Sequence, residues 1–463
     1  MTKADKNKEI SKALRATKEK RKNQICRVFE VKLDESHFSK GTMKNIERIF
    51  LEGKWYRNHA IAQENIREVS DKLDVVQVKV KDKFEDRAIK ILSSHMKQSV
   101  LAQIKDDIIG LSKKKKRGSK IGKLKFKNRC DSINLKQFGN TYQVKGNKIK
   151  IQNIGQWIRV NGLSQVDGHE IANAKLIQKP SGYYLKITCY LDKEIAIEQE
   201  KEKEYKLGIF KKPQGGGDFG ILNQITFSNG IEVNYGIEVS TKKMKKICRR
   251  LSNKDKARVE ENQKIRDENK NSKSEKDKKQ ENKRRTNNYR EQNVKLKREY
   301  EKTNNQKKDI SNKILNVIKT EYDLFGYQND NLRGWQRIWG RRMLNTAIGG
   351  IMTGLKKSST SVEIDRFAPT TKGCPMCNHK QNITLAERIF KCDQCGYTKP
   401  RDWKSAEDIQ SRAIKLVGAE RIELTPVEMQ TSTRRIFERL NAVSRVRASF
   451  VVDAGSPVPL GMG

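Results

Sequence analysis

Four cysteines near the C-terminus form two CxxC pairs, CPMC at Cys374 and Cys377 and CDQC at Cys392 and Cys395. Fourteen residues separate the pairs, and the turn-forming residues are Gly373 and Pro375 at the first pair and Gly396 after the second. Four thiolates at this spacing suit tetrahedral Zn²⁺, with Zn–S bonds of about 2.3 Å. A four-thiolate site is coordinatively closed and has no open position for water. The spacing therefore predicts a structural zinc ribbon that serves folding and nucleic-acid contact.

Aspartates occur at two further places where chemistry is expected. Asp218, in GGGDFGILNQITFS, lies inside an apolar strand that is followed by Gly220 and a second strand, so its carboxylate projects at a hairpin. Asp402, in KPRDWKSAEDIQ, lies near the start of a helix that also carries Asp408. An aspartate at a helix start is often only an N-cap. Three carboxylates brought together bind two divalent cations that promote phosphodiester hydrolysis, and Mg²⁺ suits them because it prefers oxygen ligands. The spacing alone does not decide whether Asp218 and Asp402 meet.

The charge of the chain points to a polyanionic partner. The 463 residues include 99 Lys and Arg against 56 Asp and Glu, a formal net charge of +43. Such a chain releases condensed counterions when it binds nucleic acid, which is therefore the leading partner. An anionic membrane is the alternative. However, the sequence has no run of about 18 apolar residues that would span a bilayer and no apolar signal-peptide core near its start. We expect a soluble, intracellular protein with no membrane partner.

The N-terminal half shows both strand-like and helix-like patterns. Residues 26–34 and several runs within 141–192 alternate apolar and polar side chains, as half-buried strands do. Residues 38–111 have helical spacing, and residues 1–25 are Lys-rich, which predicts a flexible basic arm. We therefore expect one β-barrel interrupted by helices.

The C-terminal half begins near Tyr205 with strand-like runs: KLGIF, GDFGILNQITFS and IEVNYGIEV. Residues 241–308 are too polar to bury a core and predict a solvated helical hairpin or partial disorder. Their many Lys and Arg favour a phosphate-contacting surface as much as plain solvation. Helical spacing returns at Ile310, and residues 324–327 are a candidate strand.

Two aromatic pairs have both a structural and a nucleic-acid interpretation. Trp335 and Trp339 lie one helical turn apart among arginines, so they either pack against the sheet or stack on bases. Packing is the favoured interpretation. Trp55 and Tyr56 either pack within the helical part or approach a duplex.

The order of these motifs carries a family resemblance. GDFGI at Asp218, VEIDRFAPTTKGCPMC, the second CxxC and RDWKSAEDI together resemble the RuvC and zinc-ribbon half of transposon-encoded TnpB nucleases and of miniature type V (V-F-like) CRISPR effectors. The resemblance covers residues 205–463, including the tail TSTRRIFERLNAVSRVRASFVVDAGSP, while the N-terminal half agrees in layout only. It implies an α/β multidomain protein: an RNase H-like RuvC domain with an inserted zinc ribbon, preceded by a wedge β-barrel that a helical recognition insert interrupts.

The implied domain boundaries are 1–37 for a basic arm and the first wedge strand, 38–112 for the helical recognition insert, 113–204 for the wedge barrel with a basic linker, 205–370 for the RuvC domain with a polar helical insert at 241–320, 371–398 for the zinc ribbon, and 399–463 for the third RuvC motif and the tail.

The resemblance also assigns roles to single residues. Asp218 corresponds to the first catalytic carboxylate, which binds Mg²⁺, and Asp402 to the third. The second is a Glu in the family, but GYQNDNLRGWQ has Asp330 at that place, a side chain shorter by one methylene. The three glycines before Asp218 are another departure from the family pattern.

Other acids are alternatives for the second carboxylate. Glu363 and Asp365 lie on the strand before the ribbon, and Glu321 and Asp323 precede the middle strand.

The implied function is that of an RNA-guided DNA endonuclease in antiviral defence in the prokaryotic cytoplasm. A guide RNA pairs with one strand of double-stranded target DNA, and the protein reads a short flanking motif. A single RuvC centre cleaves phosphodiester bonds with two Mg²⁺, while Zn²⁺ is structural. The CRISPR branch works as a homodimer on one RNA, an expectation that the resemblance alone carries.

Several alternatives stay open at the level of sequence. They are an RNA-guided DNA-binding protein with weakened or lost cleavage, a TnpB nuclease instead of a CRISPR effector, a transposition accessory that acts without RNA, and a zinc-ribbon transcription factor.

Overall fold

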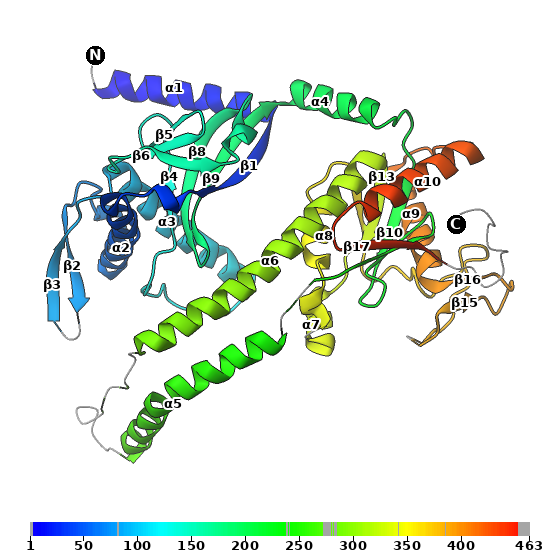
Figure 1. Cartoon of the computed structure of the whole chain (residues 1–463). Coiled ribbons are helices and arrows are strands. Elements are labelled where there is room, and N and C mark those ends of the chain that lie inside the picture. Colours follow the sequence, from blue (N-terminus) through cyan, green and yellow to red (C-terminus); the bar gives the residue numbers. More distant parts are fainter. Residues whose placement is uncertain are drawn as a thin grey trace. The chain divides into compact units, whose positions relative to one another are not determined.

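The computed structural model describes residues 3–80, 83–237, 239, 241–271, 279, 281, 285–340, 342–384 and 386–451. The chain divides into two compact units, Met1–Gln199 and Glu200–Gly463. Their elements are labelled in Figure 1. The boundary falls within α4 (Lys193–Lys206). Each unit has a sheet and a hydrophobic core of its own.

The first unit contains mainly strands, with two long helices inserted between the first and fourth of them. Its elements before α4 are α1 (Lys3–Lys22), β1 (Gln24–Leu33), η1 (Glu35–His37), α2 (Lys40–Ala62), η2 (Ile66–Glu68), β2 (Val75–Val80), β3 (Lys83–Ala88), α3 (Ser94–Lys116), β4 (Ser132–Leu135), β5 (Tyr142–Lys145), β6 (Lys148–Ile151), β7 (Ile158–Asn161), η3 (Leu163–Val166), β8 (Glu170–Lys179) and β9 (Gly182–Asp192).

Seven strands of the first unit form a nearly closed antiparallel barrel in the order β4-β8-β9-β1-β7-β6-β5. One hydrogen bond shows that the sheet nearly closes. The hydroxyl of Tyr142, on the edge strand β5, donates to the backbone oxygen of Ala172 in β8, near the other edge, at 3.0 Å. Alternate residues of β9 are buried, as the period of a strand requires. Helix α2 covers β4 closely: a Cβ atom on Gly53 would collide with the side chain of Ile133.

Two sequence predictions for this unit differ from the structure. The segment expected as a flexible basic arm forms helix α1, which contains no Gly or Pro. Its end is fixed by Arg21, whose guanidinium lies over the Tyr190 ring and pairs with Glu170 at 2.8 Å. The helical insert also contains the hairpin β2–β3, in which VVQVKV has the period-two alternation of a strand.

The second unit combines a mixed sheet with helices. Its elements after α4 are β10 (Gln214–Phe219), β11 (Ile225–Phe227), β12 (Ile231–Tyr235), α5 (Thr241–Asn271), α6 (Asn287–Glu321), β13 (Leu324–Gln328), α7 (Leu332–Trp339), η5 (Arg342–Asn345), α8 (Ile348–Leu355), β14 (Ser361–Ile364), β15 (Ile389–Lys391), β16 (Thr398–Pro400), α9 (Arg401–Val417), α10 (Pro426–Asn441) and β17 (Val446–Phe450).

The large sheet of this unit has the order β14-β13-β10-β11-β12-β17. Strands β10, β11 and β12 form an antiparallel meander, whereas β13 runs parallel to β10 and β14 parallel to β13. The apolar residues of α6, α8 and α10 belong to the same core as those of the sheet. In a smaller cluster, α9 packs on β13 and β14.

Two parts of the second unit bear on the sequence predictions. KLGIF does not form a strand: α4 ends at Lys206 and residues 207–211 have no strand partner, so Phe210 stays 84% exposed. The polar segment after β12 forms the two long helices α5 and α6, and residues 272–278 between them lie outside the described residues.

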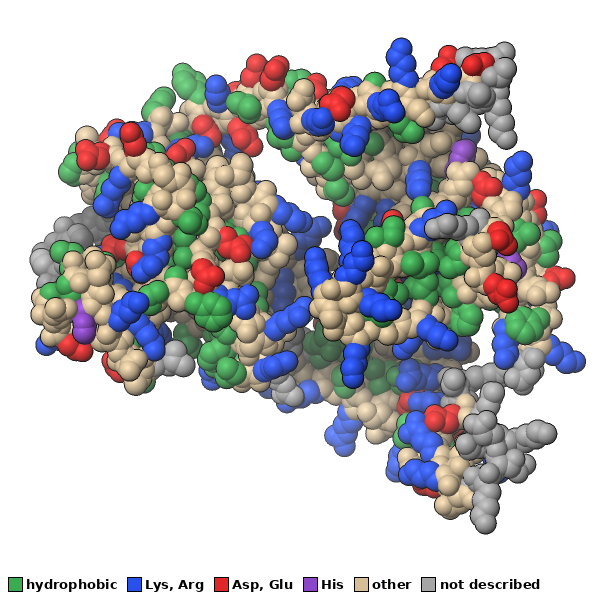
Figure 2. All heavy atoms as spheres, turned by 180° about the vertical axis from the view of Figure 1, so that it is seen from behind, with side chains coloured by type: hydrophobic (Ala, Val, Ile, Leu, Met, Phe, Trp, Pro, Cys, Tyr) green, Lys and Arg blue, Asp and Glu red, His purple; other side chains and the backbone are tan. Residues whose placement is uncertain are grey.

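Figure 2 shows many Lys and Arg side chains on the visible face, in keeping with the charge of the chain. Among the helices that the structure describes, none is long and apolar enough to cross a membrane.

Candidate active site and zinc ribbon

Helix α9 lies against β10 and β13 at two glycines. A Cβ atom on Gly216 would meet the backbone oxygen of Ala406 and lie 2.7 Å from the backbone nitrogen of Gln410. A Cβ atom on Gly326 would lie 2.9 Å from the backbone oxygen of Ile409. Real Cβ atoms essentially never come so close, so only glycine permits this approach. The three glycines that depart from the family pattern therefore include the one against which α9 packs.

The packing of α9 explains how two predicted acids come together. Asp218 lies two residues beyond Gly216, on the same face of β10. Asp402 lies one helical turn before Ala406, in the first turn of α9. The charge of Asp402 raises the pKa of Asp218, second only to the effect of burial. The sequence spacing alone did not decide whether Asp218 and Asp402 lie near each other.

Asp330 approaches the same place from β13. This strand is parallel to β10, with Tyr327 opposite Gly217, and Asp330 follows its last residue by two positions. The charge of Asp330 also acts on Asp218. Three elements thus bring three carboxyl groups to one end of the sheet.

The electrostatics of these acids are unfavourable in the chain by itself. Burial, then the charges of Asp402 and Asp330, hold the pKa of Asp218 well above its usual range. Burial raises the pKa of Asp330 to about 7, against the opposing effect of the Arg366 charge. A divalent cation would relieve both the burial of charge and the mutual repulsion. The donor set is therefore chemically suited to Mg²⁺.

Asp402 is held by arginines. Its Oδ1 lies 2.9 Å from a guanidinium nitrogen of Arg401, and its Oδ2 lies 3.6 Å from one of Arg388. Among the residues that the structure describes, the four cysteines form a group close enough to hold a metal ion, and the three aspartates as placed do not. A pair of shared cations would have to draw them closer and compete with the two arginines.

A fourth acid near this centre was missed by the sequence analysis. The strand register places Asp218 opposite Thr226 and Thr226 opposite Glu232, so the three side chains form one row across β10, β11 and β12. Burial and the Asp402 charge raise the pKa of Glu232, whose carboxylate accepts from Asn223 at 2.7 Å. The alternation of IEVNY gives the face of Glu232, but only the strand order shows that it is the face of Asp218.

The alternative acids on and just after β14 are bound to neighbouring protein groups. The Glu363 carboxylate accepts from Tyr327, Lys356 and Asn329 at 3.0, 3.0 and 2.7 Å. Asp365 is exposed and accepts from the backbone N–H of Phe367 at 2.7 Å, which caps a turn. Glu363 is a neighbour of Asp330, because both line a cavity of about 450 Å³.

The other alternative, Glu321, holds two helices together. Its fully buried carboxylate accepts from Arg435 Nε at 2.8 Å and from Arg439, both on α10. Asp323 is exposed, and its backbone N–H donates to Pro213. Asp408 pairs with Arg412 at 3.0 Å on α9.

Replacing Glu321 by alanine should destabilise the second unit strongly. The substitution leaves Arg435 and Arg439 without their buried partner, which costs about 3–5 kcal/mol. Asp323→Ala, at an exposed position two residues away, should stay within about 0.5 kcal/mol. Urea unfolding of both variants measures the difference. Loss of cleavage with unchanged stability in the Glu321 variant would instead identify Glu321 as a catalytic acid.

The aromatic pairs mainly pack. Trp335 contacts the core of the second unit, and its ring lies edge-on to Trp339, with centroids 6.1 Å apart. In the first unit, Tyr56 is fully buried and its hydroxyl donates to the backbone oxygen of Ser70, while Trp55 packs against the same core. None of these contacts requires a nucleic acid.

The four cysteines form a compact cluster. All four sulfurs lie within 4.8 Å of one another, and the Cys374–Cys395 and Cys377–Cys392 sulfur pairs are each 3.6 Å apart. Zn–S bonds of about 2.3 Å in a tetrahedron place sulfurs about 3.8 Å apart, so the cluster fits Zn²⁺.

The two CxxC turns have the same backbone form. The residue after each second cysteine, Asn378 or Gly396, has a positive φ, 59° or 72°. Its N–H donates to the backbone oxygen of the first cysteine of its pair at 3.0 Å in both turns. This repeat is what a pair of metal-binding knuckles requires, because each turn must direct two sulfurs to one point.

Lys404 joins the ribbon to α9. Its side chain is fully buried, and its ammonium donates to the backbone oxygens of Thr371 and Gly373 at 3.0 and 2.5 Å and lies over the Phe390 ring. Lys404 follows Asp402 by two residues, so the ribbon is fixed to the helix that carries the third carboxylate.

Removing zinc should unfold the ribbon selectively. Apart from the cysteines, its small core contains Phe390, with Ile383 and Tyr397 packed against it, too little apolar surface to persist without the metal. Protein purified without chelators should contain about one zinc ion per chain, since the four thiolates make one closed site. After chelation, hydrogen exchange should speed up around the cysteines and not in β1 or β9. A metal-free ribbon that keeps its protection would contradict this expectation.

Comparison with known families agrees with this geometry. The family model described as "Cas12f1-like, TNB domain" matches residues 355–409, which include β14, the four cysteines and the first half of α9 with Asp402. The match confirms the resemblance to the family of miniature type V effectors and TnpB proteins, and the cluster of four cysteines fits the zinc ribbon expected there. No curated protein matches the chain.

Proposed function

We propose that the chain is an RNA-guided DNA endonuclease whose RuvC-type centre consists of Asp218, Asp330 and Asp402. The observation that carries the proposal is the convergence of these three acids, from β10, the end of β13 and the start of α9, beside a TNB-type ribbon. A zinc-ribbon transcription factor would have no use for such a cluster.

The sheet of the second unit supports an RNase H-like domain. An antiparallel meander of three strands is continued by two parallel strands on the side of β10, with helices between them. This is the strand order expected of that fold, and β10 is its central strand. The nearly closed barrel of the first unit, with helices between β1 and β4, agrees with the layout of a wedge and a recognition insert.

The three aspartates would hold two Mg²⁺ ions, which supply charge stabilisation for the attacking water and the departing 3′ oxygen. Asp218 is central because the charges of both other acids act on it. Arg333, Lys356 and Arg366 line the cavity that contains Asp330 and would attract the phosphodiester backbone to the acids. Lys404 and the ribbon keep the start of α9, and therefore Asp402, in place.

A second function is favoured by one observation. Asp330 replaces the Glu of the family and is one methylene shorter, which would weaken cation binding. A guided DNA-binding protein with little or no cleavage is therefore the alternative.

The test begins with the protein expressed together with its flanking genomic DNA. We expect a discrete RNA to co-purify, and sequencing identifies its guide segment. A plasmid library that matches this guide and varies the flanking bases is then incubated with the complex, with and without Mg²⁺. Cleavage that requires both the guide match and Mg²⁺ supports the nuclease. Target binding without cleavage supports the second function, and the absence of any bound RNA contradicts both.

A further inference from the structure

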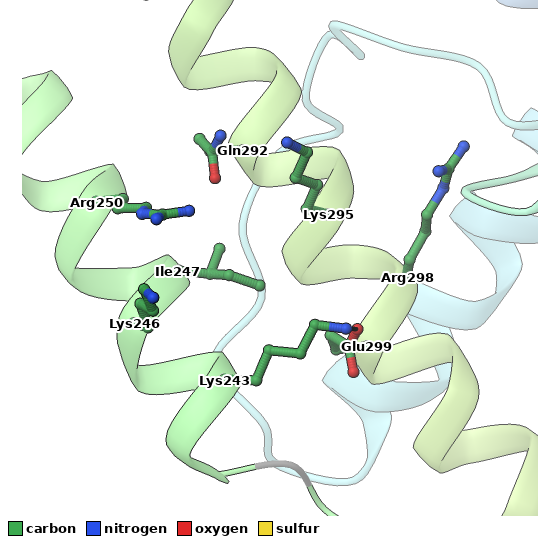
Figure 3. A pocket seen from close by; sticks show the side chains of 8 residues that line it. All are labelled: Lys243, Lys246, Ile247, Arg250, Gln292, Lys295, Arg298 and Glu299. Carbon is green, nitrogen blue, oxygen red and sulfur yellow. Dashed lines mark hydrogen bonds and ion pairs between the residues drawn. The ribbon is translucent and has the colours of Figure 1, made fainter.

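A cleft with five cationic side chains lies between α5 and α6 in the second unit (Figure 3). Its volume is about 330 Å³. We call it the α5–α6 cleft. It is lined by Lys243, Lys246, Ile247, Arg250, Gln292, Lys295, Arg298 and Glu299.

The spacing of these residues directs them into the cleft. On α5 they stand at positions i, i+3, i+4 and i+7, and on α6 at i, i+3, i+6 and i+7, which is one face of each helix. Ile247 is buried beneath them. Arg250 and Lys295 extend from opposite helices into the space between (Figure 3). Cations needed only for solubility would not have to face one another in this way.

Three cations of the α5–α6 cleft lack a counter-charge among the described residues. Glu299 is the one acid in the lining, and it pairs with Lys243. Lys246, Arg250 and Lys295 have no ion-pair partner in the part of the chain that the structure describes. Exposed cations this close together repel one another, and a polyanion laid along them would remove the repulsion.

A hydrogen-bond acceptor in the lining distinguishes between nucleic acids. Gln292 is half-buried; its Oε1 is covered and has no hydrogen-bond partner among the described residues, and a turn of the side chain would present this oxygen to the cleft. A buried acceptor without a donor costs free energy until a ligand supplies one. The ribose 2′-hydroxyl is a donor that RNA has and DNA lacks. Cations for the phosphates and an acceptor for the 2′-hydroxyl together describe an RNA backbone.

We propose that the α5–α6 cleft binds the sugar-phosphate backbone of the guide RNA. The inference rests on the proposed function and names a place on the chain where its RNA partner is held. DNA enters and leaves such an enzyme, whereas the guide RNA stays bound. The guide is therefore the polyanion that neutralises the cleft permanently.

Two charge-reversal variants test the proposal. The cleft variant combines Lys246→Glu, Arg250→Glu and Lys295→Glu. Its control combines Lys245→Glu, Arg249→Glu and Lys297→Glu, which are exposed residues on the outer faces of the same two helices. Both variants change the net charge equally, and all six positions are exposed, so both should melt at the wild-type temperature. The probe is the RNA recovered from the wild-type complex, measured by filter binding at several salt concentrations.

The cleft variant should bind this RNA at least about tenfold more weakly and lower the slope of log K against log salt by about 3, whereas the control should lose much less. Gln292→Leu should weaken binding of the RNA about tenfold, and the loss should vanish for probes with 2′-deoxy sugars at the contacted nucleotides. Ultraviolet crosslinking of the wild-type complex should recover peptides of α5 or α6 joined to RNA, whether or not the variants fold.

Three results would overturn the proposal. Wild-type affinity in the cleft variant would do so while leaving the proposed function intact. Unchanged RNA affinity with weakened target binding by the loaded complex would assign the α5–α6 cleft to DNA. A wild-type chain that retains no RNA would remove the proposal together with the proposed function.

Discussion

Asp218→Asn should abolish target cleavage, with a fall of at least about 10³-fold, while the complex still binds its guide RNA and target. The amide keeps the shape of the side chain but removes the carboxylate on which the charges of both other acids act. A thousandfold loss corresponds to about 4 kcal/mol of transition-state stabilisation, which is the scale expected for metal-ion catalysis. Single-turnover cleavage of a matched plasmid measures the rate, and a gel-shift assay with the same target measures binding.

The matched control is Asp323→Asn, an exposed acid just before β13, which should leave the rate unchanged. Asp330→Asn should resemble the Asp218 variant, whereas Asp330→Glu restores the family's side chain and should keep or raise the rate. Cleavage at the wild-type rate by Asp218→Asn would refute the assignment of the centre.

The raised pKa of Asp330 should make the folding stability of the metal-free protein depend on pH. Because the folded pKa of Asp330 is about 7, above that of an exposed Asp, ionisation opposes folding as pH rises. The Mg²⁺-free protein should lose stability between about pH 4 and pH 8 from this group, and Asp330→Asn should reduce that loss. Thermal melting across this range, with and without Mg²⁺, measures it. An identical pH profile in the variant would show that Asp330 is not buried as described.

The sequence located those parts of the site that local motifs specify. Each CxxC pair is a turn whose residues are contiguous, so the cysteine cluster follows from spacing. Asp218 and Asp402 stand next to sequence features of their own, a glycine-rich strand and a helix start. Glu232 has no such feature, because its place beside Asp218 depends on the pairing of three strands. Sequence reasoning therefore finds acids in motifs more readily than acids brought near by sheet order.

The two wrong predictions about the fold also come from local sequence that does not reveal distant partners. KLGIF has the composition of a strand, but a strand needs a neighbour, and the sheet of this unit begins only at Gln214. The N-terminal Lys-rich segment suggested disorder, yet the contacts of Arg21 with Tyr190 and Glu170 fix the end of the helix. Those partners lie more than a hundred residues away in sequence. The composition of residues 1–25 therefore gives no information about Tyr190 and Glu170.

Gly216→Val should disable the centre without touching any acid. The new side chain would push against the backbone of α9 at Ala406 and Gln410, and backbone cannot yield as a flexible side chain does. Such overpacking costs up to about 3 kcal/mol. Relief requires α9 to move away from β10, which carries Asp402 away from Asp218. Cleavage should therefore fall by at least about 100-fold, since a displacement of about 1 Å has an effect of that size.

The control for this variant is Gly236→Val. Gly236 lies just after β12 in the same unit, and a Cβ atom there would meet nothing within 4 Å. The Gly236→Val variant should have the stability and the cleavage rate of the wild type. Both glycine variants should bind guide RNA, because neither glycine lines the α5–α6 cleft. Normal cleavage by Gly216→Val would mean that α9 can shift without moving Asp402. The close approach at Gly216 would then serve packing alone, and the convergence of the acids would have to depend on Lys404 and the ribbon.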